Sequence, residues 1–259
     1  MFARASHGQA VVRGEGGRLP ALPWRWVAAA LVAAAVLVAL WLLAGRLADP
    51  DTLPIRKIRV EGALAHVDEG MLRRAIAGKV QGGFFSVDVE RVRQAVEALP
   101  WVRRAAVRRI WPDTLQIRVS EQQALAAWGR DALVNVQGEV FRPAADARPK
   151  GLPRLAGPAG QARIVSEYYR VFSDTLAPAG LAIAELKMDE RHAFRLRLRN
   201  GIALVLGREQ VEERLDRFVR VWRKALAAEA ARIARVDLRY GSGLAVQWKH
   251  GKTQTTHGG

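Results

Sequence analysis

The longest apolar run of the chain, residues 26–45, contains twenty residues without a charge and is bracketed by Arg25 and Arg46. At about 1.5 Å per residue a helix of this length reaches about 30 Å, which matches the hydrocarbon core of a bilayer. A helix also pairs its own backbone polar groups, as an apolar surrounding requires. The pattern predicts one transmembrane helix over residues 25–45.

A cleaved signal peptide is the competing interpretation of this run. Its apolar region is usually about 7–15 residues long and ends before a small-x-small cleavage site. The run is longer and no such site follows it, so we expect a retained anchor. Basic residues flank both ends, but long domains translocate largely regardless of charge. The short segment 1–24 is therefore expected in the cytoplasm and the rest of the chain on the other side of the membrane.

After the anchor, the alternation of apolar and polar residues predicts a unit of order β-α-α-β-β. Residues 55–60 alternate as a strand, and Asp68 and Ser86 are expected to cap two short amphipathic helices. Residues 102–111 and 114–120 alternate again and are separated by a tight turn, which is typical of a hairpin.

The remaining chain predicts a second unit in which helices and strands are mixed. The Pro- and Gly-rich segment 142–160 fits either an interdomain linker or an internal loop. The apolar face of a long helix fits burial against its own sheet or docking of a partner helix, with Arg217 among the residues expected outside. The expected elements are strands 125–128 and 133–141, helix 162–176, strand 181–188, a hairpin 194–206, helix 211–226, and strands 235–240 and 244–248.

Three segments resemble the POTRA domain of the FtsQ/DivIB cell-division proteins: VEG, GGFFSVDVERV and LPWVRRAAVRRIWPDTLQIRVSEQ. The resemblance continues through LVNVQGEVF, LPRLAGPAG and VDLRYGSGLAVQW, and so extends over residues 24–248. It implies an α+β fold with a single N-terminal transmembrane helix and a POTRA-like β-α-α-β-β domain at 54–122. A second mixed α/β domain with a mostly antiparallel curved sheet follows at 123–250. The resemblance also implies that segment 142–160 is an internal loop of this domain. Residues 251–259 are expected to be disordered.

The formal charge of +16, from 41 Lys and Arg against 25 Asp and Glu, first suggests nucleic-acid binding. The basic residues are scattered, and neither a stacking platform nor a helix-turn-helix pattern accompanies them. We therefore expect a solvated basic surface and no nucleic-acid partner, with anionic lipid headgroups as a second group that it can attract. The chain contains no cysteine, so no disulfide staples the fold.

No catalytic motif is found in the sequence. Cysteine is absent, no serine lies in G-x-S-x-G or S-x-x-K, and the five histidines are far apart. Residues 189–192, Asp-Glu-Arg-His, are the densest polar cluster and could hold an acid-base pair, but their place between two strands favours a solvated turn. The pattern predicts a protein that is not an enzyme, with no metal, no cofactor and no small-molecule substrate.

The physical candidate for binding is the terminal sheet, because an edge strand presents unpaired N–H and C=O groups that another chain can extend. The resemblance implies that this end binds FtsB in complex with FtsL. Tyr240 and Trp248 fit aromatic anchors, although Tyr240 fits a core position equally, and Arg239 fits pairing with a partner carboxylate. Ser242 and Gly243 fit either close backbone approach or an ordinary hairpin turn.

The resemblance implies a scaffold that links early and late division proteins and controls septal peptidoglycan synthesis. It places the protein in the bacterial inner membrane at the division septum, with its C-terminal domains in the periplasm, and widens the partner set to FtsK, FtsW, FtsI and FtsN. A POTRA-type chaperone or assembly factor for outer-membrane or secreted proteins is the alternative. A membrane-tethered hydrolase using residues 189–192 is the third class.

Overall fold

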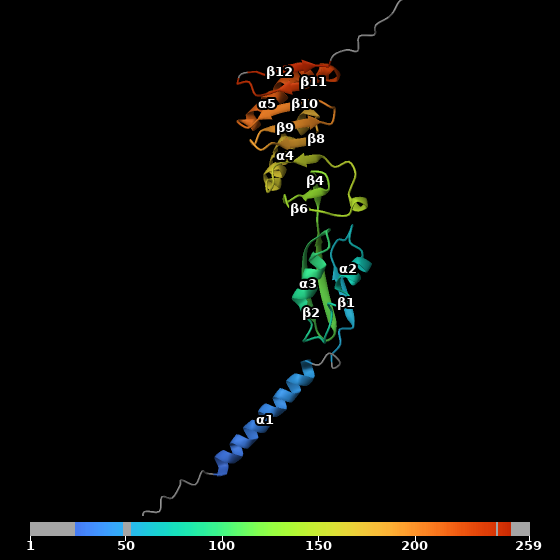
Figure 1. Cartoon of the computed structure of the whole chain (residues 1–259), viewed down its shortest axis with the longest axis vertical. Coiled ribbons are helices and arrows are strands. Elements are labelled where there is room, and N and C mark those ends of the chain that lie inside the picture. The colour runs from blue at the N-terminus through green and yellow to red at the C-terminus, as the bar shows by residue number, and fades with distance from the viewer. Residues whose placement is uncertain (1–23, 49–52, 242, 250–259) are drawn as a thin grey trace, which may run out of the picture.

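The structure is a computed structural model that describes residues 24–48, 53–241 and 243–249 (Figure 1). The expected cytoplasmic tail lies outside the described residues except for Trp24, as do the expected disordered residues 251–259 and the candidate site residue Ser242.

The apolar run forms one helix, α1 (Trp24–Ala48). The span Trp24–Arg46 contains an 18-residue window with a mean hydropathy of 2.7, and no other described part of the chain buries that window. At about 1.5 Å per residue its length suffices to cross a bilayer. Length and composition thus suggest a single-pass membrane protein.

A three-stranded domain follows α1, and its element order confirms the predicted β-α-α-β-β unit. The third strand along the chain lies in the middle of the sheet, parallel to the first strand and antiparallel to the second. The elements are β1 (Lys57–Glu61), α2 (Glu69–Ile76), α3 (Val89–Glu97), β2 (Val102–Ile110) and β3 (Thr114–Glu121).

The two helices of this domain begin at aspartates. Asp68 accepts a hydrogen bond from the Met71 backbone N–H at 2.6 Å, which confirms its predicted role as the cap of α2. The cap of α3 is Asp88, so the prediction of Ser86 is wrong. The Ser86 hydroxyl instead accepts from the Gly83 N–H at 2.8 Å and closes the glycine-rich turn before the helix.

A nine-stranded sheet forms the second domain. Its strand order is β12-β11-β10-β9-β8-β7-β4-β5-β6, and five of the eight pairings are antiparallel, as expected. The strands are β4 (Ala124–Trp128), β5 (Ala132–Asn135), β6 (Val140–Phe141), β7 (Arg154–Ala156), β8 (Ile183–Met188), β9 (Phe194–Leu198), β10 (Ala203–Gly207), β11 (Ile233–Asp237) and β12 (Ala245–Trp248).

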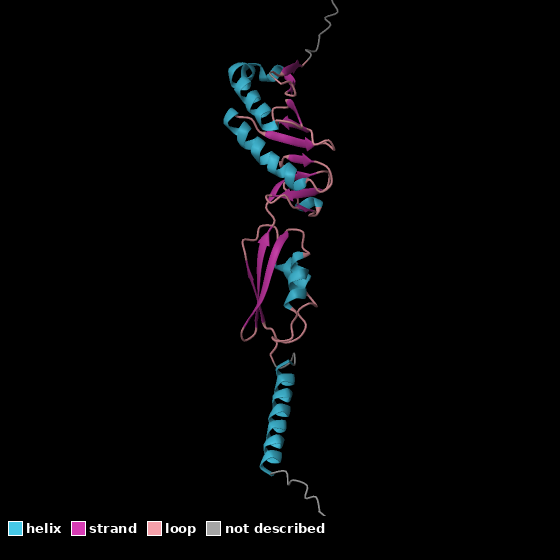
Figure 2. Ribbon diagram, turned by 90° about the vertical axis from the view of Figure 1, so that its left-hand side faces the viewer, coloured by secondary structure: helices cyan, strands magenta, loops and turns pink. Residues whose placement is uncertain are grey.

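Helices cover one face of this sheet (Figure 2). The buried side chains of α4 (Ala162–Leu176) and α5 (Val211–Val221) join the strands in one apolar core, so the apolar stripe of α5 packs within its own domain. The helix predicted over 211–226 continues after α5 as a π-helical turn, Trp222–Leu226. Short 3₁₀ turns lie at Ala145–Ala147, Ala177–Ala179 and Ala227–Arg232.

Three predictions for the nine-stranded domain differ from the structure. The strand expected over 235–240 is β11, which begins at Ile233 and already ends at Asp237. The strand expected over 133–141 is split into β5 and β6, because the Asn135 side chain accepts hydrogen bonds from the N–H groups of Gln137 and Glu139 and closes a turn. The segment 142–160 is an internal part of the domain, as the resemblance implied, but it also contains β7. This strand pairs with β4 and β8 in the middle of the sheet.

The β6 edge of the nine-stranded sheet contacts the three-stranded domain. Leu133 and Phe141 are buried in the apolar cluster of that domain. The Phe141 ring lies edge-on to Trp101, with ring centroids 5.2 Å apart. Arg103 also donates to the Glu139 carboxylate at 2.9 Å. The two domains therefore share apolar packing and an ion pair at this edge.

Candidate partner-binding site

The last strand, β12, forms the other edge of the nine-stranded sheet (Figure 1). It pairs antiparallel with β11, with Val246 opposite Val236, and no other described strand pairs with it. The outer side of an edge strand presents backbone N–H and C=O groups that another strand can bind. Val246 packs against the core, whereas Gln247 is exposed.

Arg239 and Asp237 form an ion pair where β11 ends. The Arg239 side chain donates from Nη2 to Asp237 Oδ2 at 2.7 Å and from Nε to Oδ1 at 3.0 Å. The guanidinium holds the pKa of the Asp237 carboxyl below its usual range, against the opposing effect of burial. Arg239, predicted to pair with a partner carboxylate, thus already has a carboxylate partner within the chain. The sequence signal for this pair is the D-x-R spacing, with Asp237 at the end of β11 and Arg239 two residues later.

Tyr240 lies in the loop between β11 and β12, and 58% of its surface is exposed. The alternative that it is a core residue is therefore wrong. Its backbone carbonyl accepts a hydrogen bond from Arg217 Nη2 at 2.8 Å, and the Gly241 carbonyl accepts from Nη1 at 2.5 Å. Arg217 also reaches the Leu238 carbonyl at 3.3 Å, so one side chain of α5 holds residues 238–241 of this loop.

Sequence reasoning missed this role of Arg217, which was expected on the solvated side of its helix. The side chain is half-buried, and the three carbonyls that accept its hydrogen bonds lie 21 to 24 residues further along the chain. Helical periodicity identifies the apolar face of α5 but carries no information about loop carbonyls that are distant in sequence.

Trp248 ends β12 and is 43% exposed. The Arg232 guanidinium lies 5.5 Å from the centroid of its ring, which is within the range of a cation–π contact. The next residue, Lys249, donates its backbone N–H to the Arg232 carbonyl at 2.7 Å. These contacts hold the indole at the sheet edge while leaving much of its surface free for a partner.

Gly243 is half-buried, and a Cβ placed on it would meet no atom within 4 Å. Packing within the described chain therefore does not require glycine here, whereas close approach of another backbone would. The structure thus brings four of the five predicted site residues, Arg239, Tyr240, Gly243 and Trp248, to one end of the sheet.

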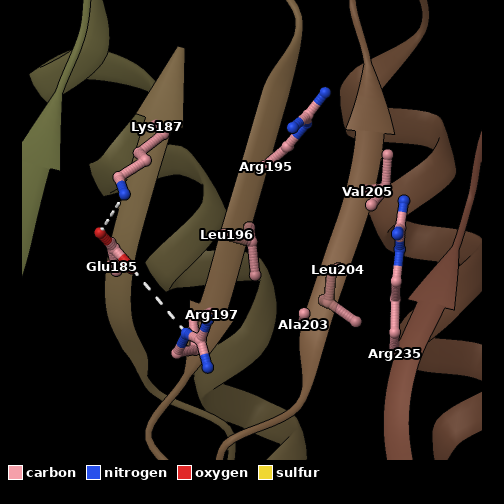
Figure 3. A pocket seen from close by; sticks show the side chains of 9 residues that line it. All are labelled: Glu185, Lys187, Arg195, Leu196, Arg197, Ala203, Leu204, Val205 and Arg235. Carbon is pink, nitrogen blue, oxygen red and sulfur yellow. Dashed lines mark ion pairs between the residues drawn. The ribbon is translucent and has the colours of Figure 1, made fainter. Parts of the chain in front are cut away.

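The sheet face opposite the helices carries a shallow, basic pocket of about 270 Å³ (Figure 3). Glu185 forms ion pairs there with Lys187 at 2.7 Å and Arg197 at 3.8 Å. Arg195 and Arg235 make no ion pair with any residue of the described ranges. One cross-strand row continues from Arg197 through Ala203 and Arg235 to Gln247, so this basic face extends to β12.

The polar cluster 189–192 forms the turn between β8 and β9, as expected. Asp189 Oδ1 accepts hydrogen bonds from the backbone N–H groups of Arg191 and Ala193, each at 2.9 Å. The Ala193 bond is the largest cause that lowers the pKa of this carboxyl. Within the part of the chain that the structure describes, no group of three His, Cys, Asp or Glu residues could hold a metal ion.

A second polar cluster lies at the domain junction around Glu121, which ends β3. Its carboxylate accepts backbone hydrogen bonds from Ala65 at 3.1 Å, His66 at 3.0 Å and Val67 at 2.8 Å. Burial opposes the charged form, but these bonds together lower the pKa of the Glu121 carboxyl. The His66 ring stacks on Trp101 with centroids 3.7 Å apart, so the cluster adjoins the ring that contacts Phe141.

Comparison with known proteins identifies both domains. Residues 53–122 match the family described as POTRA domain, FtsQ-type, and residues 126–239 match Cell division protein FtsQ/DivIB, C-terminal. A cell division protein FtsQ from Coxiella burnetii is 37% identical over 218 residues, which are 83% of this chain and 90% of the relative. This chain belongs to the FtsQ/DivIB family.

Further relatives with the FtsQ name agree. The protein from Shewanella oneidensis is 41% identical over 83% of this chain and 81% of its own length. The protein from Alcanivorax borkumensis is 36% identical over 88% of this chain and 87% of its own length. These FtsQ relatives are named as cell division proteins and not as enzymes. Of the predicted site residues, Arg239 lies within the matched C-terminal region and the others follow it.

Proposed function

We propose that this FtsQ-family protein is a non-enzymatic division scaffold that binds FtsB, in complex with FtsL, by strand addition to β12. The observation that carries the proposal is an edge strand, β12, whose outer side pairs with no other described strand and which lies beside two exposed aromatic side chains, Tyr240 and Trp248. Main-chain pairing supplies affinity, and the aromatic rings supply buried anchors once the partner covers them.

The loop before β12 supports this proposal because it is held in place before any partner binds. Arg217 bonds three of its carbonyls, and Arg239 is fixed by Asp237. A loop ordered in advance loses less conformational entropy on binding. The open space above Gly243 gives a partner backbone room to approach.

The proposed topology places segment 1–24 in the cytoplasm, α1 in the bacterial inner membrane and both domains in the periplasm. Partners anchored in the same membrane are confined with the protein, which raises their effective concentration, so contacts of modest area suffice. Through such contacts the protein would link early and late division proteins at the septum and control peptidoglycan synthesis there. The wider partner set proposed is FtsK, FtsW, FtsI and FtsN.

The POTRA-type chaperone is the second candidate, because β1 and β2 each pair with β3 and with no other described strand. Both outer strands of the three-stranded sheet could therefore receive an extended segment. The described residues contain one helix of transmembrane length and one such domain, which favours the scaffold over this alternative.

The test is binding of the full chain, reconstituted in lipid nanodiscs, to the FtsB–FtsL complex. Tyr240→Glu should weaken binding at least about tenfold, equivalent to ~1.4 kcal/mol, because a charge would be buried against the partner. Val140→Glu is the matched control, since Val140 is 37% exposed on the opposite edge of the same sheet. Undiminished binding by a folded Tyr240→Glu variant would contradict the proposed site, and no binding by the unchanged protein would favour the chaperone.

A further inference from the structure

Three segments meet at the end of the three-stranded domain where the chain arrives from α1. The Phe84 N–H donates to the Leu53 carbonyl at 2.7 Å, and the Arg56 N–H donates to the Asp113 carbonyl at 2.9 Å. We call residues 53–57, 83–85 and 111–113 the entry end. Figures 1 and 2 show the turn between β2 and β3 at the end of this domain that faces α1.

The entry end exposes two large aromatic side chains. Trp111, at the turn between β2 and β3, is 74% exposed, and Phe85 is 50% exposed. The Phe85 ring lies edge-on to the buried Phe84, with centroids 5.3 Å apart, so it projects from a packed base. Tryptophan is highly buried on average in soluble domains, whereas its apolar body and polar N–H suit the interface between membrane and water.

Exposed cations accompany these rings. Arg56 and Lys57 are both exposed, and they precede and begin β1 beside the turn. Arg109, which lies two residues before Trp111, is also exposed and donates to the Val87 carbonyl at 2.7 Å. The nearby Asp113 carboxylate accepts from the Thr114 hydroxyl at 3.0 Å. Lys and Arg side chains close to an anionic membrane surface are attracted to its headgroups.

The chain itself keeps the entry end close to the bilayer. Four residues separate Ala48, the last residue of α1, from Leu53. The five steps from Ala48 to Leu53, at about 3.3–3.6 Å each, span no more than about 18 Å. The headgroup region on each side of a bilayer is about 5–8 Å thick. An apolar and basic surface on so short a tether meets lipid headgroups at a high effective concentration.

We infer that the entry end docks on the surface of the bilayer that holds α1. Trp111 and Phe85 enter the interface, and Arg56 and Lys57 lie against anionic headgroups. This inference rests on the membrane anchor of the proposed function. Docking restricts rotation of the three-stranded domain about its tether and so directs the nine-stranded domain, with β12, away from the membrane.

The full chain offers a clean test because it contains no cysteine. Gln81→Cys places a reporter on an exposed position two residues before Gly83, and Ala63→Cys places one beyond the other end of β1. Each variant, labelled with an environment-sensitive fluorophore, is reconstituted in vesicles of phosphatidylcholine and phosphatidylglycerol. Quenching by spin-labelled lipid then reports which label contacts the bilayer.

Quenching should be strong at position 81 and weak at position 63, and replacing phosphatidylglycerol by phosphatidylcholine should reduce it. Adding Trp111→Ser should lower the docked population about tenfold, because the variant no longer has an indole ring to insert into the interface. Trp111→Phe keeps the ring and should restore most of the quenching. Circular dichroism of each variant confirms that its domains are folded.

Vesicle flotation separates this inference from the anchor on which it rests. A chain that does not float with the vesicles contradicts the anchor. A chain that floats but shows equal, weak quenching at positions 81 and 63 overturns the docking of the entry end. Unchanged quenching in a folded Trp111→Ser variant overturns the role of Trp111, and equal quenching in both lipid compositions overturns the role of the cations.

Discussion

The two edges of the nine-stranded sheet differ in what lies against them. At one edge, β6 has two residues, and its Phe141 is buried against Trp101 of the three-stranded domain. At the other edge, β12 has four residues, and the aromatic rings beside it, Tyr240 and Trp248, are exposed. Both edges carry aromatic side chains, but the chain covers only the first within the residues that the structure describes.

The difference separates two uses of an edge strand. An uncovered edge invites pairing with other chains, and proteins usually shorten, charge or cover it. The β6 edge is short and covered, so its aromatic ring stabilises the junction of the two domains. The β12 edge is longer and uncovered, and its preceding loop is held by Arg217, which is consistent with a surface kept ready for a partner.

The largest effect should come from Phe141→Ala. Removing a buried ring typically costs about 3–5 kcal/mol, and here it would leave a cavity between the two domains. Denaturant unfolding of the full chain should show this loss in the free energy of unfolding. Binding at β12 should change little, because Phe141 lies at the opposite edge.

Val140→Ala is the control for Phe141, because Val140 is the exposed neighbour on the same strand. Its effect should stay below about 1 kcal/mol. Equal losses for the two variants would show that the packing of Phe141 does not stabilise the junction, and the contrast between the edges would fail.

A smaller effect is expected from Arg217→Ala at the open edge. The substitution removes hydrogen bonds to three loop carbonyls and should destabilise the loop by about 1–3 kcal/mol. Backbone amides of residues 238–241 should exchange hydrogen faster, and partner binding should weaken because the loop is no longer ordered in advance. Arg220→Ala, an exposed neighbour on α5, should change neither quantity. Slow exchange retained in Arg217→Ala would refute the positioning role.

The smallest effect should be the response to acid of the Glu121 cluster, which lies at the junction of the two domains. The folded pKa of Glu121 is lowered, so its stabilising contribution is present above about pH 4.3, the unfolded value. That contribution is lost as pH falls through the lower folded value. Hydrogen exchange at residues 65–67 should therefore accelerate in acid.

Glu121→Gln should remove this acid dependence at residues 65–67 and cost about 1 kcal/mol at neutral pH. The N–H of Arg239, which bonds Asp237 at the open edge, should keep its own acid response in the same variant. Acid-dependent exchange that persists at residues 65–67 would show that another group controls that loop.

Local patterns predicted most elements because they depend on neighbouring residues. The apolar spacing placed α4 at its observed bounds, and Asp68 marked the start of α2. The prediction failed at Ser86, whose hydroxyl closes a turn with the Gly83 N–H and does not cap the helix. It also failed at β7, a strand too short to show an alternating pattern. A three-residue strand is defined by its neighbours in the sheet and not by its own alternation.

The candidate site shows the same division. The resemblance carried by VDLRYGSGLAVQW selected Arg239, Tyr240, Ser242, Gly243 and Trp248. The structure brings the four of them that it describes, all but Ser242, to one sheet edge. The partner of Arg239 lies two residues before it and was open to a sequence argument. The role of Arg217 could not be predicted from the sequence, because its acceptors belong to a loop that only folding brings next to α5.

Composition, periodicity and contiguous motifs were enough to predict the apolar helix of transmembrane length, the β-α-α-β-β order and the family resemblance. The folded structure was needed to learn which strand ends each sheet, which edge the other domain covers and which aromatic rings stay exposed. These properties depend on contacts between residues far apart in the chain, and no local pattern encodes which surfaces such contacts leave open.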